Sequence, residues 1–452
     1  MKIVIIGDGK VGNTLMKQLS KEGHDIVIID NNMEVLERAL NSYDVMTING
    51  NGASYPVQKQ AGVDKSDLLI AATSSDELNM LSCFMGKKLG VKYAVSRVRN
   101  PEYSEQLFLM RDDLGIDRVI NPEFTAAKEI SRILRFPTAI RVETFTRGRA
   151  ELVEIKVAEN SKLNGLPLTS LYSKYHVKIL VCAVQRNSQI IIPSGDFFLQ
   201  SGDTISIIAT ASEILNFFKR TGVLMDKIKS VMIVGGSRIG YYLSKLLLEL
   251  GMSVKIIDND EDTCRKLSES LPRATIIYGD GTDHDLLVEV GINEVDAFVS
   301  LTNIDEENIV LSMFAMKMEV NKVIGKVNKL SFSKLVSQDM ADCFISPKYL
   351  TANEIVSFVR GLQNTVGCSV QTLHRIINNQ VEVLEFAIRV EEEFIGIPLK
   401  DLEIRSNLLI ACIIRDDKTI IPGGNDTIEV GDNVIVVTTI PYLRDFIDIF
   451  SL

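Results

Sequence analysis

Tryptophan is absent from this chain of 452 residues, and histidine and cysteine occur only four and six times. So few residues of these types exclude a histidine-rich metal site and a small secreted domain held together by disulfides. No two cysteines form a C-x-x-C pair, so we expect reduced and mostly buried thiols at Cys83, Cys182, Cys264, Cys343, Cys368 and Cys412.

Long hydrophobic runs are also missing. The longest, such as residues 408–414, are much shorter than the about 20 apolar residues that a membrane-spanning helix needs. Met1 and Lys2 lead directly into an apolar run and a glycine, which leaves no room for a signal peptide. We therefore expect a cytoplasmic protein that does not itself cross the bilayer.

Acidic residues outnumber basic ones by 59 to 49, which gives a net charge of −10. Such a surface repels nucleic-acid phosphates and anionic lipid, so it disfavours a nucleic-acid-binding function. The apolar fraction of 46% is ordinary for a globular protein. By length alone, the chain suggests about three domains.

An internal repeat organises the chain. Residues 3–12 recur as residues 231–240. Other motifs match at nearly the same offset: Asp30 with Asp258, residues 50–52 with 279–281, residues 193–195 with 422–424, and residues 202–203 with 431–432. The sequence therefore predicts two copies of one unit, each large enough for two domains.

The first part of each copy alternates strand and helix patterns. In copy 1, apolar runs at residues 3–6 and 26–29 flank Val11, Leu15 and Leu19 at helical spacing. Further short apolar runs predict strands at residues 68–72, 231–234, 254–257 and 297–301. Alternation of this kind predicts a parallel, doubly wound sheet.

The last third of each copy has a different pattern, in which short strands alternate with polar turns. The predicted fold class is α/β: two Rossmann-like doubly wound parallel sheets, each followed by a small α+β domain. The expected bounds are residues 1–125 and 228–350 for the Rossmann-like domains, and 140–225 and 368–452 for the small ones. We expect a helical stretch at residues 211–229 to bridge the two copies.

A glycine loop follows the first predicted strand. Gly7, Gly9 and Gly12 have the G-x-G-x-x-G spacing, and Asp30 ends the next strand. The glycines permit a tight turn, close approach to a pyrophosphate, and close packing of helix on strand. The helix N-terminus attracts phosphate, and Asp30 can accept both ribose hydroxyls. No arginine follows Asp30, which favours NAD or an adenosine phosphate over NADP; the alternative is a glycine-rich turn in an empty domain.

The second copy departs from this pattern. Ser237 stands where the middle glycine belongs, and its side chain would crowd a pyrophosphate. Asp258 keeps the same spacing as Asp30, so a second nucleotide site stays credible.

Four basic residues are candidate phosphate ligands. Lys10 and Arg238 share one position in the two loops, and Arg97 and Lys326 follow equivalent strands. Solvated surface charge is the alternative interpretation for all four.

No metal site is predicted. Acidic residues around Asp280 resemble a cation cluster, but such loop carboxylates are more often solvated turn residues. The four histidines show no ligand spacing.

Catalytic signatures are missing as well. The sequence has no nucleophile elbow, no P-loop lysine and no evident proton-transfer pair. Two nucleotide sites without a catalytic partner favour a sensor over an enzyme. A tandem-Rossmann NAD-dependent oxidoreductase is the alternative, and the regulatory subunit of another transporter is a third possibility.

The order of Rossmann-like and small domains, repeated once, resembles the tandem regulator-of-potassium-conductance family, and within it the peripheral regulatory subunits of Trk potassium uptake systems. The resemblance covers nearly the whole chain. Its marks are residues 7–12 with Asp30, residues 50–52, 71–73 and 97–103, and the late Pro-x-Gly and Gly-Asp pairs.

The resemblance implies nucleotide-binding residues in both copies, with NAD(H) and/or ATP or ADP as regulatory ligands. In copy 1 these are Gly7, Asp8, Gly9, Lys10, Val11, Gly12, Asp30, Asn51, Thr73, Ser74 and Arg97. In copy 2 they are Gly235, Gly236, Ser237, Arg238, Ile239, Gly240, Asp258, Asp280, Thr302 and Lys326.

The resemblance also implies a regulatory function on the cytoplasmic face of the membrane. Such a subunit gates a Trk-type membrane potassium-translocating subunit when nucleotide binding rearranges a ring of Rossmann-like lobes. The ring forms by self-association, as a tetramer of this two-copy chain. Which nucleotide activates, and whether the two copies bind different ones, stays open.

Overall fold

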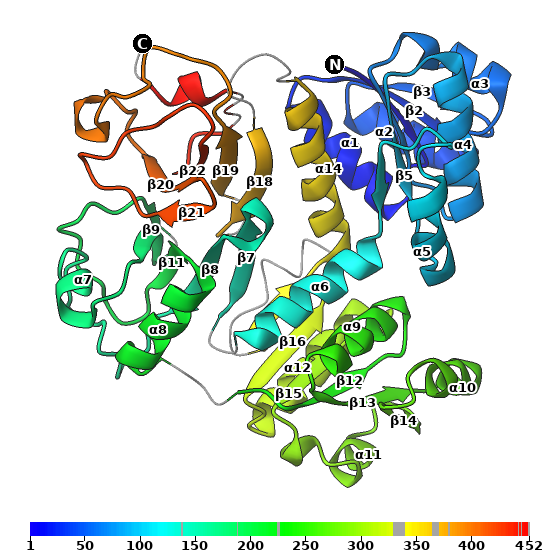
Figure 1. Ribbon diagram of the computed structural model, residues 1–452. Coiled ribbons are helices and arrows are strands. Elements are labelled where there is room, and N and C mark those ends of the chain that lie inside the picture. Colours follow the sequence, from blue (N-terminus) through cyan, green and yellow to red (C-terminus); the bar gives the residue numbers. More distant parts are fainter. Residues whose placement is uncertain are drawn as a thin grey trace. The chain divides into compact units, whose positions relative to one another are not determined.

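The computed structural model describes residues 1–136, 139–187, 189–223, 227–328, 340–363, 370–377, 380–441, 443 and 445–450. Its contacts divide the chain into two compact units. One, the Rossmann unit, contains Met1–Ser131 and Lys229–Val356; the other, the small-domain unit, contains Arg132–Ile228 and Ser357–Leu452. Each unit thus combines the corresponding parts of both copies (Figure 1).

The first lobe of the Rossmann unit is a parallel sheet in the order β3-β2-β1-β4-β5-β6. Its strands are β1 (Lys2–Ile6), β2 (Asp25–Asp30), β3 (Met46–Asn49), β4 (Leu68–Ala71), β5 (Tyr93–Arg97) and β6 (Arg118–Ile120). Its helices are α1 (Lys10–Lys21), α2 (Met33–Ser42), α3 (Tyr55–Gln60), α4 (Asp76–Leu89), α5 (Pro101–Met110) and α6 (Pro122–Arg135), of which α6 runs on into the small-domain unit.

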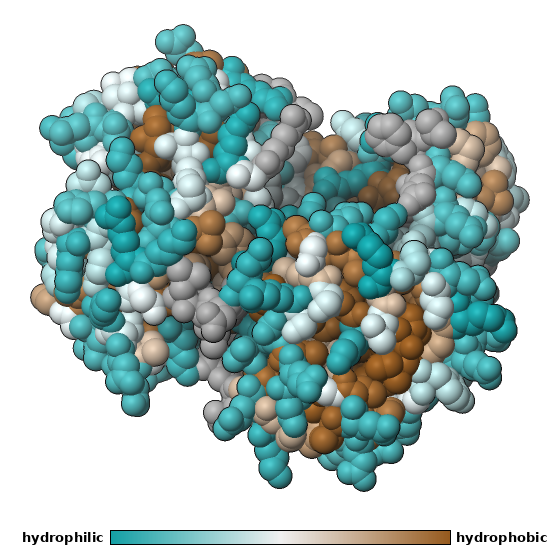
Figure 2. Space-filling model, turned by 60° about the horizontal axis from the view of Figure 1, so that its bottom comes forward, coloured by the Kyte–Doolittle hydropathy of each residue, from teal (hydrophilic) through white to brown (hydrophobic). Residues whose placement is uncertain are grey.

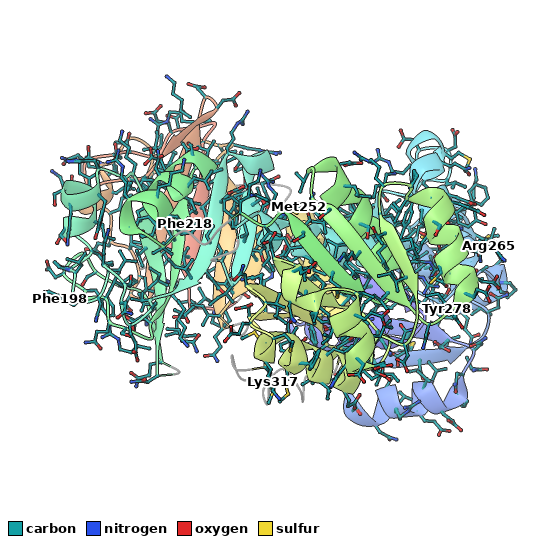
Figure 3. All side chains as sticks on the ribbon, turned by 90° about the horizontal axis from the view of Figure 1, so that it is seen from below. Phe198, Phe218, Met252, Arg265, Tyr278 and Lys317 are labelled. Carbon is teal, nitrogen blue, oxygen red and sulfur yellow. The ribbon has the colours of Figure 1, made fainter. Side chains whose placement is uncertain are left out.

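The second lobe repeats this topology in the order β14-β13-β12-β15-β16-β17. Its strands are β12 (Ser230–Val234), β13 (Ser253–Asp258), β14 (Thr275–Tyr278), β15 (Ala297–Ser300), β16 (Lys322–Lys326) and β17 (Cys343–Ile345). Its helices are α9 (Arg238–Glu249), α10 (Glu261–Ser270), α11 (His284–Glu289), α12 (Asp305–Lys317) and α14 (Pro347–Gln363). Since α10 packs against the edge strand β14, Arg265 and Tyr278 lie at the same end of this lobe (Figure 3).

Continuous burial explains the parallel sheets. Ile3, Val4, Ile5 and Ile6 of β1 are all almost completely buried, because neighbouring elements cover both faces of the strand. In each lobe the strand order reverses beside the first strand, between β1 and β4 or β12 and β15, and ligands of such sheets bind at that point. The predicted fold class is confirmed, whereas the bounds of the four domains stay predictions.

The small-domain unit contains two antiparallel sheets, in the orders β10-β9-β11-β8-β7 and β18-β19-β22-β20-β21. The first comprises β7 (Arg141–Phe145), β8 (Ala150–Lys156), β9 (Leu180–Arg186), β10 (Gln189–Ile191) and β11 (Thr204–Ala209), with helices α7 (Ser170–Tyr175) and α8 (Ala211–Thr221). The second comprises β18 (Val370–Ile376), β19 (Val381–Ala387), β20 (Leu408–Arg415), β21 (Lys418–Ile420) and β22 (Asn433–Thr438).

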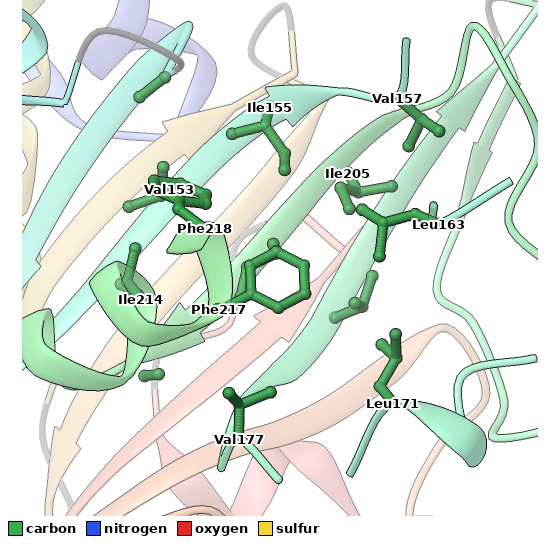
Figure 4. Packing of buried hydrophobic residues seen from close by; sticks show 14 of the residues in the cluster. Val153, Ile155, Val157, Leu163, Leu171, Val177, Ile205, Ile214, Phe217 and Phe218 are labelled. Atoms are coloured by element: carbon green, nitrogen blue, oxygen red, sulfur yellow. The ribbon is translucent and has the colours of Figure 1, made fainter. Parts of the chain in front are cut away.

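Helix α8 belongs to the first small domain. Its Ile214, Phe217 and Phe218 are buried against Val153 and Ile155 of β8 (Figure 4). Of the helical stretch expected at residues 211–229, the helix is confirmed for Ala211–Thr221. Its expected place as a bridge between the copies is wrong, because its apolar face is part of the core of the first small domain. Residues 224–226 lie outside the described part.

The two small sheets contact each other at equivalent positions. The Ile377 amide donates to Glu154 Oε1 at 3.2 Å, and the Thr146 amide donates to Glu385 Oε2 at 3.3 Å. One apolar cluster includes buried residues of both sheets, such as Cys182 and Cys412. Burial raises the pKa of both thiols to about 12.

All five described cysteines are free thiols, four of them buried, whereas Cys368 lies outside the described residues. Among the described helices, none is long and apolar enough to cross a membrane.

A buried ion-pair network in the small-domain unit gives a stability prediction. Glu382 contacts Arg360 at 3.0 Å and Arg375 at 3.2 Å, and the Arg360 side chain is only 3% exposed. Removing the Glu382 carboxylate takes away a negative charge that compensates the buried Arg360 guanidinium. Glu382→Ala should therefore lower the free energy of unfolding by about 3 kcal/mol. Chemical denaturation measures the change.

The control is the exposed pair of Asp262 and Arg265 on α10. Asp262→Ala should cost less than about 1 kcal/mol, because water screens exposed pairs. Equal costs for the two variants would contradict the assignment of the buried network.

Candidate nucleotide-binding sites

The two glycine loops have the geometry that the motif requires. Gly7 and Gly235 have φ of +94° and +106°, in the left-handed region that favours glycine. A Cβ on Gly12 would lie 1.9 Å from the Gly7 carbonyl oxygen, and one on Gly240 would lie 2.5 Å from that of Gly235. The first and third glycines are thus needed for the turn and for close packing.

The middle position of the loop is open. A Cβ on Gly9 would meet no described atom within 4 Å, so the backbone tolerates the Ser237 side chain at the equivalent place. The Ser237 hydroxyl is buried and has no hydrogen-bond partner among the described residues. Ser237 also lines a cavity beside this loop, so a ligand bound there would meet it either as a crowding neighbour or as a hydrogen-bond partner.

A carboxylate holds each loop to the end of the second strand. Asp30 Oδ2 accepts a hydrogen bond from the Asp8 amide at 2.7 Å, and its Oδ1 accepts one from Asn32 at 2.9 Å. Asp258 accepts equivalent bonds from Gly236 at 2.6 Å and from Asp260. Each carboxylate oxygen keeps acceptor capacity for a ribose hydroxyl.

A cavity of about 440 Å³ lies beside the second loop. Its lining includes five of the predicted residues: Gly235, Ser237, Asp258, Asp280 and Thr302. The other predicted residues of this copy, namely Gly236, Arg238, Ile239, Gly240 and Lys326, are not part of that lining. The cavity thus joins the loop to the ends of three strands.

Two buried asparagines fix the strand ends, although neither is among the site residues predicted from the sequence. Asn79 Oδ1 accepts from the Thr73 amide at 2.8 Å, and its Nδ2 donates to the Arg97 carbonyl at 2.9 Å. In the second lobe, Asn308 Oδ1 accepts from the Thr302 amide at 2.8 Å, and Asn308 Nδ2 donates to the Lys326 carbonyl at 3.0 Å. The signal was present, because both asparagines are part of the internal repeat.

The acidic residues near Asp280 serve local turns. Asp280 accepts hydrogen bonds from the Thr282 amide and hydroxyl, and these lower its pKa although burial opposes them. Asn51 makes the equivalent turn in copy 1 by accepting from Ala53. The described residues contain no group of His, Cys, Asp and Glu side chains that could hold a metal ion.

Arg97 is the last residue of β5 and is largely buried. Its guanidinium lies 3.8 Å from Glu123, and its Nη1 donates to the Thr73 carbonyl at 3.5 Å. Burial lowers the pKa of Arg97, whereas the nearby Glu123 carboxylate raises it. Arg99 and the loop residue Arg238 of the second lobe lower this pKa further. The Ser74 carbonyl accepts from Arg99.

Lys326 has the corresponding place in the second lobe. Its Nζ donates to the Leu301 carbonyl at 3.2 Å. Burial lowers the pKa of Lys326 to about 8; Asp305 opposes this shift, and the loop residue Lys10 of the first lobe adds to it. In both lobes, therefore, a strand-end cation lies within electrostatic reach of the loop cation of the other lobe.

Direct contacts join the two lobes within the Rossmann unit. Asn121 Nδ2 donates to the Tyr242 hydroxyl at 3.0 Å, and that hydroxyl donates to the Arg99 carbonyl at 3.2 Å. Arg118 and Glu354 form an ion pair at 3.0 Å. These contacts place the ends of β5 and β6 against helices α9 and α14.

The loop geometry predicts unequal effects of two alanine substitutions. Gly12→Ala forces a Cβ into the Gly7 carbonyl and should destabilise the chain by about 1–3 kcal/mol, as overpacking does. Gly9→Ala meets open space and should leave the melting temperature nearly unchanged. Thermal melting of the two variants tests this, and an equal loss in both would contradict the loop geometry.

Family models match the chain in four segments. A model described as the TrkA-N domain matches residues 3–122 and 231–347, and one described as the TrkA-C domain matches residues 152–222 and 383–451. Among solved structures of similar fold is the GsuK RCK domain, with a TM-score of 0.64 and 17% identity over 96% of this chain and 92% of that one. The GsuK channel bound to NAD has a TM-score of 0.65 and 17% identity, over 97% of this chain and 76% of that one. GsuK bound to ADP has a TM-score of 0.51 and 16% identity, over 79% of this chain and 69% of that one.

Two curated relatives match over nearly their full length. A Trk system potassium uptake protein TrkA homolog of Archaeoglobus fulgidus is 34% identical, over 96% of this chain and 97% of the relative. The Trk system potassium uptake protein TrkA of Vibrio alginolyticus is 31% identical, over 96% of this chain and 95% of the relative. With both domain types matched twice in the same order, the chain belongs to the TrkA family.

Proposed function

We propose that this chain is a nucleotide-sensing regulatory subunit that gates a Trk-type membrane potassium-translocating subunit from the cytoplasmic side. The regulatory ligands are NAD(H) and/or ATP or ADP, held at the two glycine loops by the residues that the sequence predicts. Family membership supports the potassium system, and similarly folded chains bound to NAD and to ADP support the ligand class.

One observation carries the proposal: the loop cation of each lobe acts on the strand-end cation of the other. Lys10 adds to the lowering of the Lys326 pKa, and Arg238 adds to that of Arg97. Like charges repel, and burial strengthens the repulsion. Nucleotide phosphates at a loop would neutralise one such pair, so a ligand would stabilise the arrangement in which these cations lie close together.

This charge pairing explains how ligand binding could change the arrangement of the two lobes and thereby gate the membrane subunit. A ligand shifts a conformational equilibrium only through different affinities for the two states. Here the phosphates bind more tightly when two cations, one from each lobe, are near them. Occupied and empty sites therefore favour different arrangements of the two lobes, and a ring of lobes transmits that difference to the membrane subunit.

Exposed apolar side chains support self-association into such a ring, a tetramer of this chain. Leu81 on α4 is 51% exposed, and the equivalent helix α12 exposes Val310 and Met313. Figure 2 shows an apolar patch on the face that it presents. Large exposed apolar patches typically mark protein interaction sites.

Potassium flux tests the function directly. In liposomes that contain the membrane subunit, adding this chain should change the flux, and ATP, ADP or NADH should change it again. The same liposomes without the chain are the control. Flux that ignores the nucleotides would contradict the proposal, and substrate-dependent oxidation of NADH would favour an oxidoreductase instead.

Binding tests the cation pairing. In a chain whose first site is disabled by Asp30→Ala, ATP binding reports the second site. Adding Lys10→Ala, in the first lobe, should weaken this binding about tenfold, since a hydrogen bond to a charged group contributes about 1.5–3 kcal/mol. Calorimetric titration measures the affinity.

Lys21→Ala, at the far end of the same helix α1, is the matched control and should change nothing. If Lys10→Ala leaves ATP affinity at the second site intact, the two lobes do not share the ligand.

A further inference from the structure

Asp8, the second residue of the first glycine loop, is a buried acid whose carboxyl oxygens accept no hydrogen bond from the described residues. Its side chain is only 6% exposed. Its own amide donates to Asp30 Oδ2 at 2.7 Å. The carboxyl thus belongs to the loop that would hold a pyrophosphate, and Arg38 is the cation among the described residues that acts on it.

The groups that act on the Asp8 carboxyl come from three elements. Burial raises its pKa to about 6; the Asn13 amide on α1 and Arg38 on α2 lower it, while the Asp30 carboxylate at the end of β2 raises it. Since burial outweighs the stabilising groups, the neutral form is favoured well above the pH at which an exposed aspartate ionises.

The second loop has nothing comparable. Gly236 stands in the place of Asp8, and a Cβ there would lie 2.6 Å from Leu267, 3.2 Å from Thr263 and 3.2 Å from Asp258. In the second lobe, the side chains of Leu267, Thr263 and Asp258 thus occupy the space that an acidic side chain at this position would need. The two sites differ at this position in both charge and shape.

A bound pyrophosphate and an ionised Asp8 would repel each other at short range. A protonated Asp8 instead offers an O–H group that can donate to a phosphate oxygen. We propose that Asp8 makes the first nucleotide site proton-linked: a nucleotide binds there as one proton from solvent passes to the Asp8 carboxyl, whereas the second site has glycine at this position and takes up no proton there. The inference rests on the proposed function, since it presumes nucleotide binding at both loops.

The sign of the pH dependence follows from linkage. Below a pH of about 6 the Asp8 carboxyl is already neutral in the free chain, and affinity does not change with pH. Above it, binding must take up a proton, so the dissociation constant rises by up to about tenfold per pH unit until the pKa of the complex is reached. The first site thus binds more tightly as the pH falls.

NADH is the probe, because its pyrophosphate diester has no group that titrates near neutral pH. In full-length chain carrying Asp258→Ala, calorimetric titration reports the first site. Repeating it in two buffers of different ionisation enthalpy counts the protons taken up. Above the free-chain pKa we expect close to one proton per NADH and a dissociation constant that rises with pH. In chain carrying Asp30→Ala, the second site should take up almost none at about pH 7, where Lys326, whose pKa is about 8, is already protonated.

Asp8→Asn keeps the shape of the side chain and removes the titrating group. In the Asp258→Ala background it should abolish both proton uptake and pH dependence, and bind NADH about tenfold or more tightly than the unsubstituted aspartate at mildly alkaline pH. Asp8→Gly, which copies Gly236, should also abolish them. Thermal melting provides a second readout: Asp8→Asn should raise the melting temperature above about pH 6 and change it little at pH 4.

The outcomes separate the two proposals. Proton uptake that persists in Asp8→Asn, a pH-independent first site in the unsubstituted chain, or NADH binding at the second site alone would each overturn the role of Asp8. Absence of nucleotide binding at both sites at every pH would instead overturn the proposed function.

Discussion

The carboxylate that ends the second strand of each lobe fixes the geometry on which the rest of the Rossmann unit depends. Asp30 joins the loop after β1 to the start of α2, and Asp258 does the same in the second lobe. The carboxylate that would bind a ribose thus also holds the phosphate loop in place through its hydrogen bonds. If the ligand binds as proposed, its recognition and the loop shape depend on the same atoms, so a change at either aspartate would act on both.

Duplication within one chain lets equivalent positions differ where they meet. Glu154 and Glu385 are equivalent, and each accepts a backbone amide from the other copy. Glu143 and His374 are equivalent too, and they contact each other at 2.6 Å. Two identical copies would place glutamate against glutamate, a costly juxtaposition for buried acids. A single chain with two diverged copies can place an imidazole there instead.

The sequence predicts the sheets well, because the continuous apolar runs of β1 and β12 leave few alternatives. It predicts the glycine loops equally well, since their spacing follows from backbone sterics. It does not reveal the role of Asn79, because an amide near the start of a helix is typical of solvated surface until the fold places it between two strands. The sequence also does not predict that Lys10 acts on Lys326, because these residues come near each other only when the two lobes pack together.

The same fold gives the two sites unlike electrostatics. Arg97 has Glu123, the second residue of α6, as a partner at 3.8 Å. The second residue of α14 is Lys348, whose pKa burial lowers; Asp305 opposes this shift, and Lys10 adds to it. At the end of β5, therefore, an acid on the following helix faces the strand-end cation, whereas at the end of β16 that position holds a second cation and the acids that act on Lys326 are Asp305 and Glu123. A negative ligand would therefore meet different charge at the two loops, although the folds of the two lobes repeat.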